Sequence, residues 1–83
     1  MINATPQELA NLMQELIEKA IEGANANVKA ISPGHFEIAV NAPSLAGMMK
    51  VKQQQQVYGA IAHLLVGAQA PVHAIDKMEI QTA

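Results

Sequence analysis

Apolar residues recur every three or four positions in two parts of the chain, which is the spacing of one face of an α-helix. The first part predicts a helix over residues 6–22. Thr5 suits the N-cap, Pro6 the first helical position, and Glu8 the position that closes a capping box. Gly23 stands where a left-handed residue commonly ends a helix. The residues expected to pack in the core are Leu9, Leu12, Met13, Leu16, Ile17, Ala20 and Ile21.

The second helical pattern lies between Gly47 and Gly67, and Gly67 is expected to cap its C-terminus. Its expected core-facing residues are Val51, Val57, Tyr58, Ile61, Leu64 and Leu65. Its expected solvent-facing residues are Lys50, Lys52, Gln53, Gln55, Gln56 and His63. Pro71 cannot continue a helix, so a strand is expected to start at Val72.

Between the two helices the pattern changes to the alternation of β-strands. A weaker strand pattern covers residues 26–31 and a clearer one covers residues 35–41. The clearer strand turns one face inward with Phe36, Ile38 and Val40. Ser32-Pro33-Gly34 is a turn sequence, so the two strands are expected to form an antiparallel hairpin. A short helical turn is expected over residues 43–46.

The strand that starts at Val72 alternates imperfectly. Residues of one parity are expected to face the helices, and these are Val72, Ala74, Met78 and Ile80. Ile75 and Asp76 break this alternation. His73 would point to the open side of the sheet, as would His35 at the start of the preceding strand.

A helical connection between the second and third strands favours a parallel pairing of these strands. The sequence therefore predicts an α+β fold in a single domain over residues 1–83. The predicted order is α-β-β-α-α-β, with a three-stranded mixed sheet that carries helices on one face.

Composition narrows the classes of function. The chain has no cysteine, so any metal would need other side chains or ligands from a partner. A formal charge of −2 provides no basic field for nucleic acid or anionic membrane, and no segment reaches the ~20 apolar residues of a membrane span. We expect a cytoplasmic protein without membrane contacts. No nucleophile motif, phosphate-binding loop or His-Glu-x-x-His array is present, so we expect no enzymatic activity.

Several spaced motifs resemble the BolA-like family, and most closely its short IbaG-type branch. They are the run GMMKVKQQQQVYG over residues 47–59, the triplet Val72-His73-Ala74, and the pair His35-Phe36. The resemblance implies the BolA-like fold, itself similar to the type II KH arrangement. This fold has the same element order as the one predicted from the hydrophobic pattern.

The resemblance also implies a function. In BolA-like proteins the His of the Val-His-Ala motif is a ligand of a [2Fe–2S] cluster shared with a monothiol glutaredoxin, and this role maps onto His73. Imidazole can replace thiolate on a cluster iron, so the missing thiolates would come from the glutaredoxin and its glutathione. We expect no cofactor in the isolated chain. The implied role is non-enzymatic, in iron–sulfur cluster handling or iron-dependent regulation.

From the pattern alone, a lone strand histidine such as His73 is more often structural, and it is the resemblance that favours a ligand. Many family members carry a longer loop with Cys or His before the His-Phe pair, whereas this chain has only Ser32-Pro33-Gly34. His35 is the candidate second metal ligand, because it opens a strand parallel to the one that His73 opens. The alternative is that His35 only closes the turn by hydrogen bonding. His63 is expected to be solvated on its helix.

The alternative function is that of a KH-like nucleic-acid-binding transcriptional regulator. A KH domain brings a Gly-x-x-Gly loop against the phosphates, whereas this chain has Gly47-Met48-Met49-Lys50 without a second glycine. Lys50 and Lys52 are the only nearby cations, so nucleic-acid binding is expected to be weak. Formation of a homodimer is left open.

Overall fold

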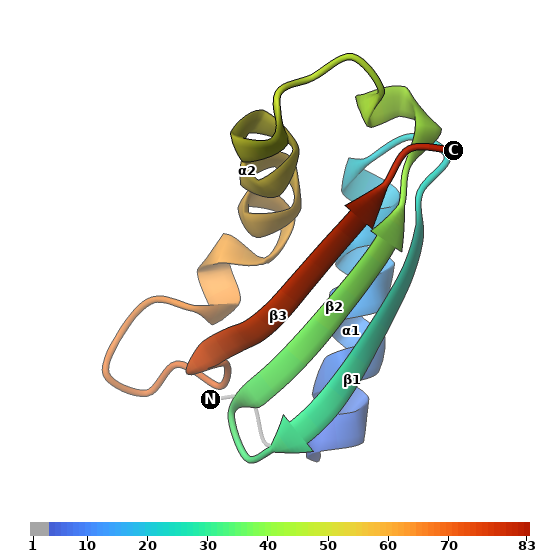
Figure 1. The fold of residues 1–83 in the computed structure, drawn as a ribbon. Helices are drawn as coiled ribbons and strands as arrows, with labels where there is room; N and C mark the ends of the chain where they lie inside the picture. The colour runs from blue at the N-terminus through green and yellow to red at the C-terminus, as the bar shows by residue number, and fades with distance from the viewer. Residues whose placement is uncertain (1–3) are drawn as a thin grey trace.

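The computed structural model describes residues 4–83, which form a sheet with helices on one of its faces (Figure 1). The elements in chain order are α1 (Pro6–Ala20), β1 (Asn25–Ser32), β2 (His35–Asn41), η1 (Pro43–Leu45), α2 (Lys50–Ile61), η2 (Ala62–Leu64) and β3 (Ala74–Gln81). The sheet order is β1-β2-β3, with β1 and β2 antiparallel and β2 and β3 parallel. The predicted α+β fold class, element order and mixed sheet are confirmed.

The N-terminus of α1 is built by a capping box. The Thr5 hydroxyl accepts a hydrogen bond from the Glu8 N–H at 3.1 Å, and the Glu8 carboxylate accepts one from the Thr5 N–H at 2.9 Å. These two bonds satisfy N–H groups that have no partner within the helix, as predicted. At the other end, Gly23 has the expected left-handed backbone with φ 70°.

Helix α1 ends at Ala20, before the predicted end at residue 22, because Ile21 already has an extended backbone with φ −119° and ψ 116°. Ile21 nevertheless remains buried. The prediction that Ala20 packs in the core is wrong, since Ala20 is exposed. Ala10, which was not among the expected core residues, is fully buried on the inner face of the helix.

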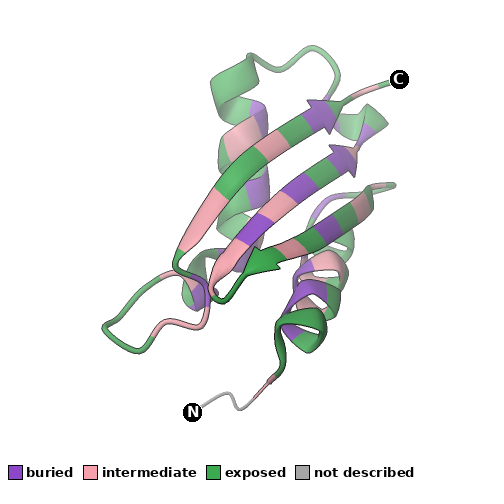
Figure 2. Cartoon of the chain, turned by 60° about the horizontal axis from the view of Figure 1, so that its bottom comes forward, coloured by how far each residue is buried: buried purple, intermediate pink, exposed green. Residues whose placement is uncertain are grey.

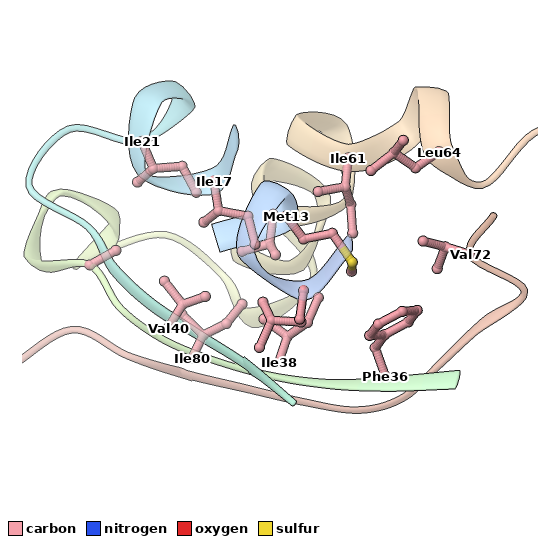
Figure 3. Packing of buried hydrophobic residues seen from close by; sticks show 14 of the residues in the cluster. Met13, Ile17, Ile21, Phe36, Ile38, Val40, Ile61, Leu64, Val72 and Ile80 are labelled. Atoms are coloured by element: carbon pink, nitrogen blue, oxygen red, sulfur yellow. The ribbon is translucent and has the colours of Figure 1, made fainter. Parts of the chain in front are cut away.

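Strand β2 is the centre of the sheet, and its alternation is confirmed. Phe36, Ile38 and Val40 are buried, whereas the residues between them are partly or fully exposed (Figure 2). The buried residues of β2 pack against α1 and α2 (Figure 3). One face of the sheet is therefore closed by the helices, and the other face is open to solvent.

Strand β3 carries one residue more than the facing part of β2. The residue pairs across the two strands are His35 with Ala74, Phe36 with Ile75, and then Glu37 with Lys77. Asp76 is thus an extra residue, which makes a β-bulge in this parallel pair.

The bulge overturns the predicted parity of the first part of β3. Residues in register on neighbouring strands share a face, so Ala74 lies on the open face and Ile75 on the inner face, where it packs against the core. The prediction that Ala74 faces the helices is therefore wrong. Beyond the bulge, Met78 and Ile80 are inward-facing as predicted, because they pair with inward-facing residues of β2.

Helix α2 presents a different face to the core from the predicted one. Val57 and Ile61 are buried as expected, but Val51 is 52% exposed and Tyr58 is 40% exposed. Gln53, predicted to face solvent, is buried instead. A buried amide group is stable only when it is hydrogen-bonded, and Gln53 makes such bonds.

Two carbonyl groups of the preceding turn hold Gln53 inside. Its Nε2 donates hydrogen bonds to the carbonyls of Leu45 at 3.2 Å and Met48 at 3.1 Å. The turn itself lies where the short helical segment was predicted. A polar side chain therefore occupies an inward position of α2 and displaces apolar side chains to the surface.

The C-terminal end of α2 tightens into the 3₁₀-helix η2, which places Leu64 in the core. Gly67 has the left-handed backbone expected of a cap, with φ 97°, but it lies in the loop beyond η2. Within residues 4–83, no helix combines the length and the apolar character needed to cross a membrane.

Candidate functional site

The two predicted metal ligands, His35 and His73, lie at the same end of the sheet, as expected for parallel neighbouring strands. Each is adjacent in sequence to a fully buried residue, Phe36 or Val72 (Figure 3). These two side chains pack in the same core cluster at that end of the sheet. The core therefore anchors the backbone on which each histidine is carried.

Gly34 connects the two histidine segments. Its carbonyl accepts hydrogen bonds from the N–H groups of His73 at 2.8 Å and Ala74 at 3.0 Å, and it is the residue directly before His35. The backbone of His73 is thus tied to the turn that begins β2. This connection places the backbone of His73 beside the start of β2, where His35 lies.

The imidazole of His73 packs against Gly34. A Cβ atom at position 34 would lie 2.8 Å from Cγ and 2.9 Å from Nδ1 of His73, which is closer than such atoms approach. Gly34 also has φ +79°, a conformation that other residues rarely adopt. Both the space and the backbone angle therefore require glycine beside His73.

His73 is exposed and lines an open hollow of about 440 Å³ next to the N-terminus of α1. The hollow is lined by Ala4, Pro6, Leu9, Pro33, Gly34, Ala70, Pro71 and His73. Its wall is mostly apolar, and among the described residues that line it His73 is the one with an ionisable side chain. His73 therefore presents its ring beside mostly apolar groups.

His35 has different surroundings on the open face of the sheet. Its Nδ1 lies 3.0 Å from Oδ1 of Asp76, and the two side chains are 42% and 41% exposed. The side-chain hydrogen bond of His35 thus goes to the bulge in β3. The alternative interpretation, in which His35 bonds to the Ser32–Gly34 turn, is not what the structure shows. In the sequence, Asp76 is visible only as a break in the alternation, and this break marks the bulge that carries the contact.

The prediction that parity sends both histidines to the open face needs correction. Ala74, not His73, is in register with His35, and β3 begins at Ala74, one residue after His73. His73 is held before the strand by Gly34 and lines the hollow beside α1. The reason is that the bulge shifts the pairing of β2 and β3 by one residue.

Comparison with known proteins supports the architecture. No family model and no curated protein matches the sequence. Among solved structures, a bolA protein homologue from Coxiella burnetii matches 98% of this chain and 92% of its own chain, with a TM-score of 0.66 and 18% sequence identity. This chain has a BolA-like fold. At this identity the match concerns the fold, and the assignment to the IbaG-type branch stays a prediction.

In this BolA-like fold, the described residues place two candidate metal ligands, His35 and His73, at one end of the sheet. Among residues 4–83, no three His, Cys, Asp or Glu side chains converge on one point. An ionised carboxylate only accepts hydrogen bonds, so the contact with Asp76 places the proton of a neutral His35 ring on Nδ1 and leaves the Nε2 lone pair free. The imidazoles of His35 and His73 are thus chemically suited to a metal group that takes its other ligands from elsewhere.

His63, the third histidine, lies on η2 and is exposed as predicted. It is separated in sequence from both candidate ligands, and no hydrogen bond of its side chain is seen within residues 4–83. It serves as an internal comparison for experiments on the other two.

A second surface of the BolA-like fold combines cations with apolar groups on α2. Lys50 and Lys52 are exposed, as are Met49 and Tyr58 on the same segment. The sequence holds no Asp or Glu over residues 38–75. Residues 38–75 are therefore a basic stretch of a chain whose net charge is negative, and positive charge is the feature that a nucleic-acid interface would need.

Proposed function

We propose that this chain is a non-enzymatic BolA-like protein that binds a monothiol glutaredoxin and shares a [2Fe–2S] cluster with it. His73 is the ligand from this chain, and His35 provides the second ligand position. The cellular role is iron–sulfur cluster handling or iron-dependent regulation, in the cytoplasm. The observation that carries the proposal is the connection through Gly34, which brings two histidine segments together at one end of a BolA-like sheet.

The residues of this chain hold and orient imidazoles. Two backbone hydrogen bonds to Gly34 fix the segment of His73, and the glycine leaves room for its ring. The carboxylate of Asp76 holds the ring of His35 through Nδ1. Since the chain lacks cysteine, the thiolate ligands come from the glutaredoxin and glutathione. When bound, the cluster supplies exchangeable iron and one-electron chemistry.

The hollow beside His73 supports a shared site. Its wall, formed partly by Pro6, Leu9 and Pro71, carries no charged side chain among the residues that the structure describes, so a partner can approach His73 without burying one of them. A ligand that protruded from a strongly charged surface would impose a larger desolvation cost on binding. The surroundings of His73 thus favour a protein partner over a free ion as the source of the metal group.

The proposal is tested by co-expressing the chain with monothiol glutaredoxins of its own organism and purifying the complex anaerobically. We expect visible absorption and circular dichroism of a [2Fe–2S] cluster in the complex. His73→Ala should alter these spectra, whereas His63→Ala, which removes an exposed imidazole elsewhere, should leave them unchanged. A complex whose spectra are the same with and without His73 contradicts the assignment.

The two exposed lysines at the start of α2, in a stretch of sequence without Asp or Glu, favour nucleic-acid binding as a second candidate function. Two exposed lysines, Lys50 and Lys52, can neutralise only a few phosphates, so we propose weak binding that falls steeply with salt. Fluorescence anisotropy with labelled single- and double-stranded DNA at several salt concentrations measures it. Sequence-specific binding in the nanomolar range at physiological salt would make this the main function.

A further inference from the structure

The extra residue in β3 meets His35 on the open face of the sheet. We propose that Asp76 is a positioning residue: it fixes the His35 imidazole with the proton on Nδ1, so that Nε2 is the atom offered to the metal group. This inference rests on the proposed function, because it takes His35 as a ligand. It assigns a role to a residue that the family motifs do not include.

The bulge is what makes this contact. With unbroken register after Phe36, residue 76 would lie opposite Glu37, and two carboxylates would face each other across the strands. Instead the register shifts by one, Lys77 takes the place opposite Glu37, and Asp76 is released to contact His35. Bulges often re-aim a side chain at a functional site, and here the re-aimed side chain is a carboxylate.

The lysines near Asp76 lie beside other carboxylates, so they do not compete with His35 for Asp76. Lys29, Glu37 and Lys77 form a row across the three strands, in register and alternating in charge. Lys77 also forms an ion pair with Glu79 at 3.1 Å. The cation nearest to Asp76 in sequence is therefore engaged elsewhere, and the side-chain hydrogen bond of Asp76 within residues 4–83 is the one to His35.

The chemistry of the pair fits a metal ligand. A histidine that binds a metal through one ring nitrogen commonly donates the other N–H to a carboxylate, which fixes the tautomer and the ring orientation. Both side chains are about two-fifths exposed, and an ion pair at such a site contributes little to folding stability. Orientation of the ring is the larger consequence of this contact.

The tautomer is measured first, on the isolated chain without any metal. Long-range ¹⁵N–¹H correlation spectra in alkaline buffer, in which imidazoles are neutral, report which ring nitrogen carries the proton. We expect the Nδ1–H form for His35, and a shift toward the Nε2–H form in Asp76→Ala and Asp76→Asn. Glu79→Gln is the matched control. It also removes a carboxylate from the open face of β3, but this carboxylate contacts Lys77 and not His35.

The same variants are then compared in the complex with glutaredoxin. Loss of such a carboxylate partner typically weakens metal binding by about 10–100-fold, so we expect a chelator to remove the cluster about 10-fold faster or more from the Asp76 variants than from the wild type and Glu79→Gln. If the tautomer of His35 does not depend on Asp76, the proposal is wrong. It is equally wrong if the tautomer changes but the rate of cluster loss does not.

These outcomes are separable from failure of the proposed function. If no cluster forms in the wild-type complex, or if His73→Ala has no effect on it, the shared cluster itself is refuted. If the cluster forms and depends on His73 but not on Asp76, only the positioning role of Asp76 is refuted.

Discussion

The two histidines at the end of the sheet are held by different kinds of contact. His73 is held through its backbone, by two adjacent N–H groups that bond to the Gly34 carbonyl. His35 is held through its side chain, by a single hydrogen bond to Asp76 on an exposed face. A backbone restraint withstands most side-chain substitutions, whereas a side-chain restraint depends on one carboxylate. We therefore expect His73 to be the fixed ligand position and His35 the adjustable one.

The largest effect is expected from Gly34→Ala, which breaks the backbone restraint. The substitution forces a left-handed angle on alanine and drives its Cβ into the His73 ring, so we expect a loss of about 2–4 kcal/mol in the free energy of unfolding. Urea denaturation measures this loss, and ¹H–¹⁵N spectra should show shifted His73 resonances.

Gly59→Ala provides the control for that experiment. Gly59 lies in α2 with open space around its Cα and an ordinary backbone angle, so alanine there should be neutral or stabilising by up to about 1 kcal/mol. If Gly34→Ala behaves like Gly59→Ala, the backbone restraint on His73 is not what the structure suggests.

An intermediate loss of stability is expected from Gln53→Met. This substitution tests whether a loss of global stability alone disturbs the two histidines at the end of the sheet. This substitution keeps the length of the side chain but leaves the Leu45 and Met48 carbonyls without their donor, at a cost of about 1–3 kcal/mol. Chemical denaturation should show this loss, while the His35 and His73 resonances stay in place. Gln55→Met, at an exposed position of the same helix, should change stability little.

The opposite result would change the comparison between the two histidines. Histidine resonances that move in Gln53→Met as much as in Gly34→Ala would mean that the two imidazoles are held by the whole core and not by their local contacts.

The smallest expected effect is a loss of folding stability in acid. It involves Glu8, in the first turn of α1, the helix whose N-terminus adjoins the hollow beside His73. Hydrogen bonds from the backbone and hydroxyl of Thr5 hold the pKa of Glu8 below its ordinary value of 4.5. A carboxyl with a lowered pKa in the folded state contributes stability above its unfolded pKa, and this contribution is lost as the pH falls through the folded value. Stability should therefore decline modestly on acidification below about pH 4.5.

Glu8→Gln isolates that contribution. Thermal unfolding across acidic pH should show a smaller decline in Glu8→Gln than in the wild type, since the amide does not titrate. Identical pH profiles for the two proteins would show that the capping box does not contribute to acid sensitivity.

Local signals in the sequence were sufficient to predict the start of α1 and the inward face of β2. The Thr5–Glu8 capping box depends on residues three apart, and the alternation of Phe36, Ile38 and Val40 depends on one strand facing one core. Such features are decided within a few residues, so the sequence alone predicts them.

The inward turn of Gln53 and the bulge at Asp76 depend on contacts between elements. Gln53 is buried because the carbonyls of Leu45 and Met48, in η1 and in the turn after it, lie within reach, which no helical periodicity reveals. The bulge is visible in the sequence as a broken alternation, but its effect on the partner of His35 needs the register of two strands. The sequence therefore predicted that His35 and His73 lie at the same end of the sheet, but it missed the contact of Asp76 with His35 and the side to which His73 is exposed.

The central claim is that an imidazole nitrogen of His73 binds the shared cluster, and labelled histidine tests it most directly. The chain is produced with ¹⁵N-labelled imidazoles, combined with unlabelled glutaredoxin and glutathione, and the cluster is reduced to its paramagnetic state for pulsed electron-nuclear double resonance. The account predicts strong hyperfine coupling to ¹⁵N that loses the His73 contribution in His73→Ala, disappears when His35→Ala is added to His73→Ala, and is unchanged in His63→Ala. A cluster-loaded complex with no ¹⁵N coupling, or with a coupling that is the same in the wild type and in His73→Ala, would contradict it.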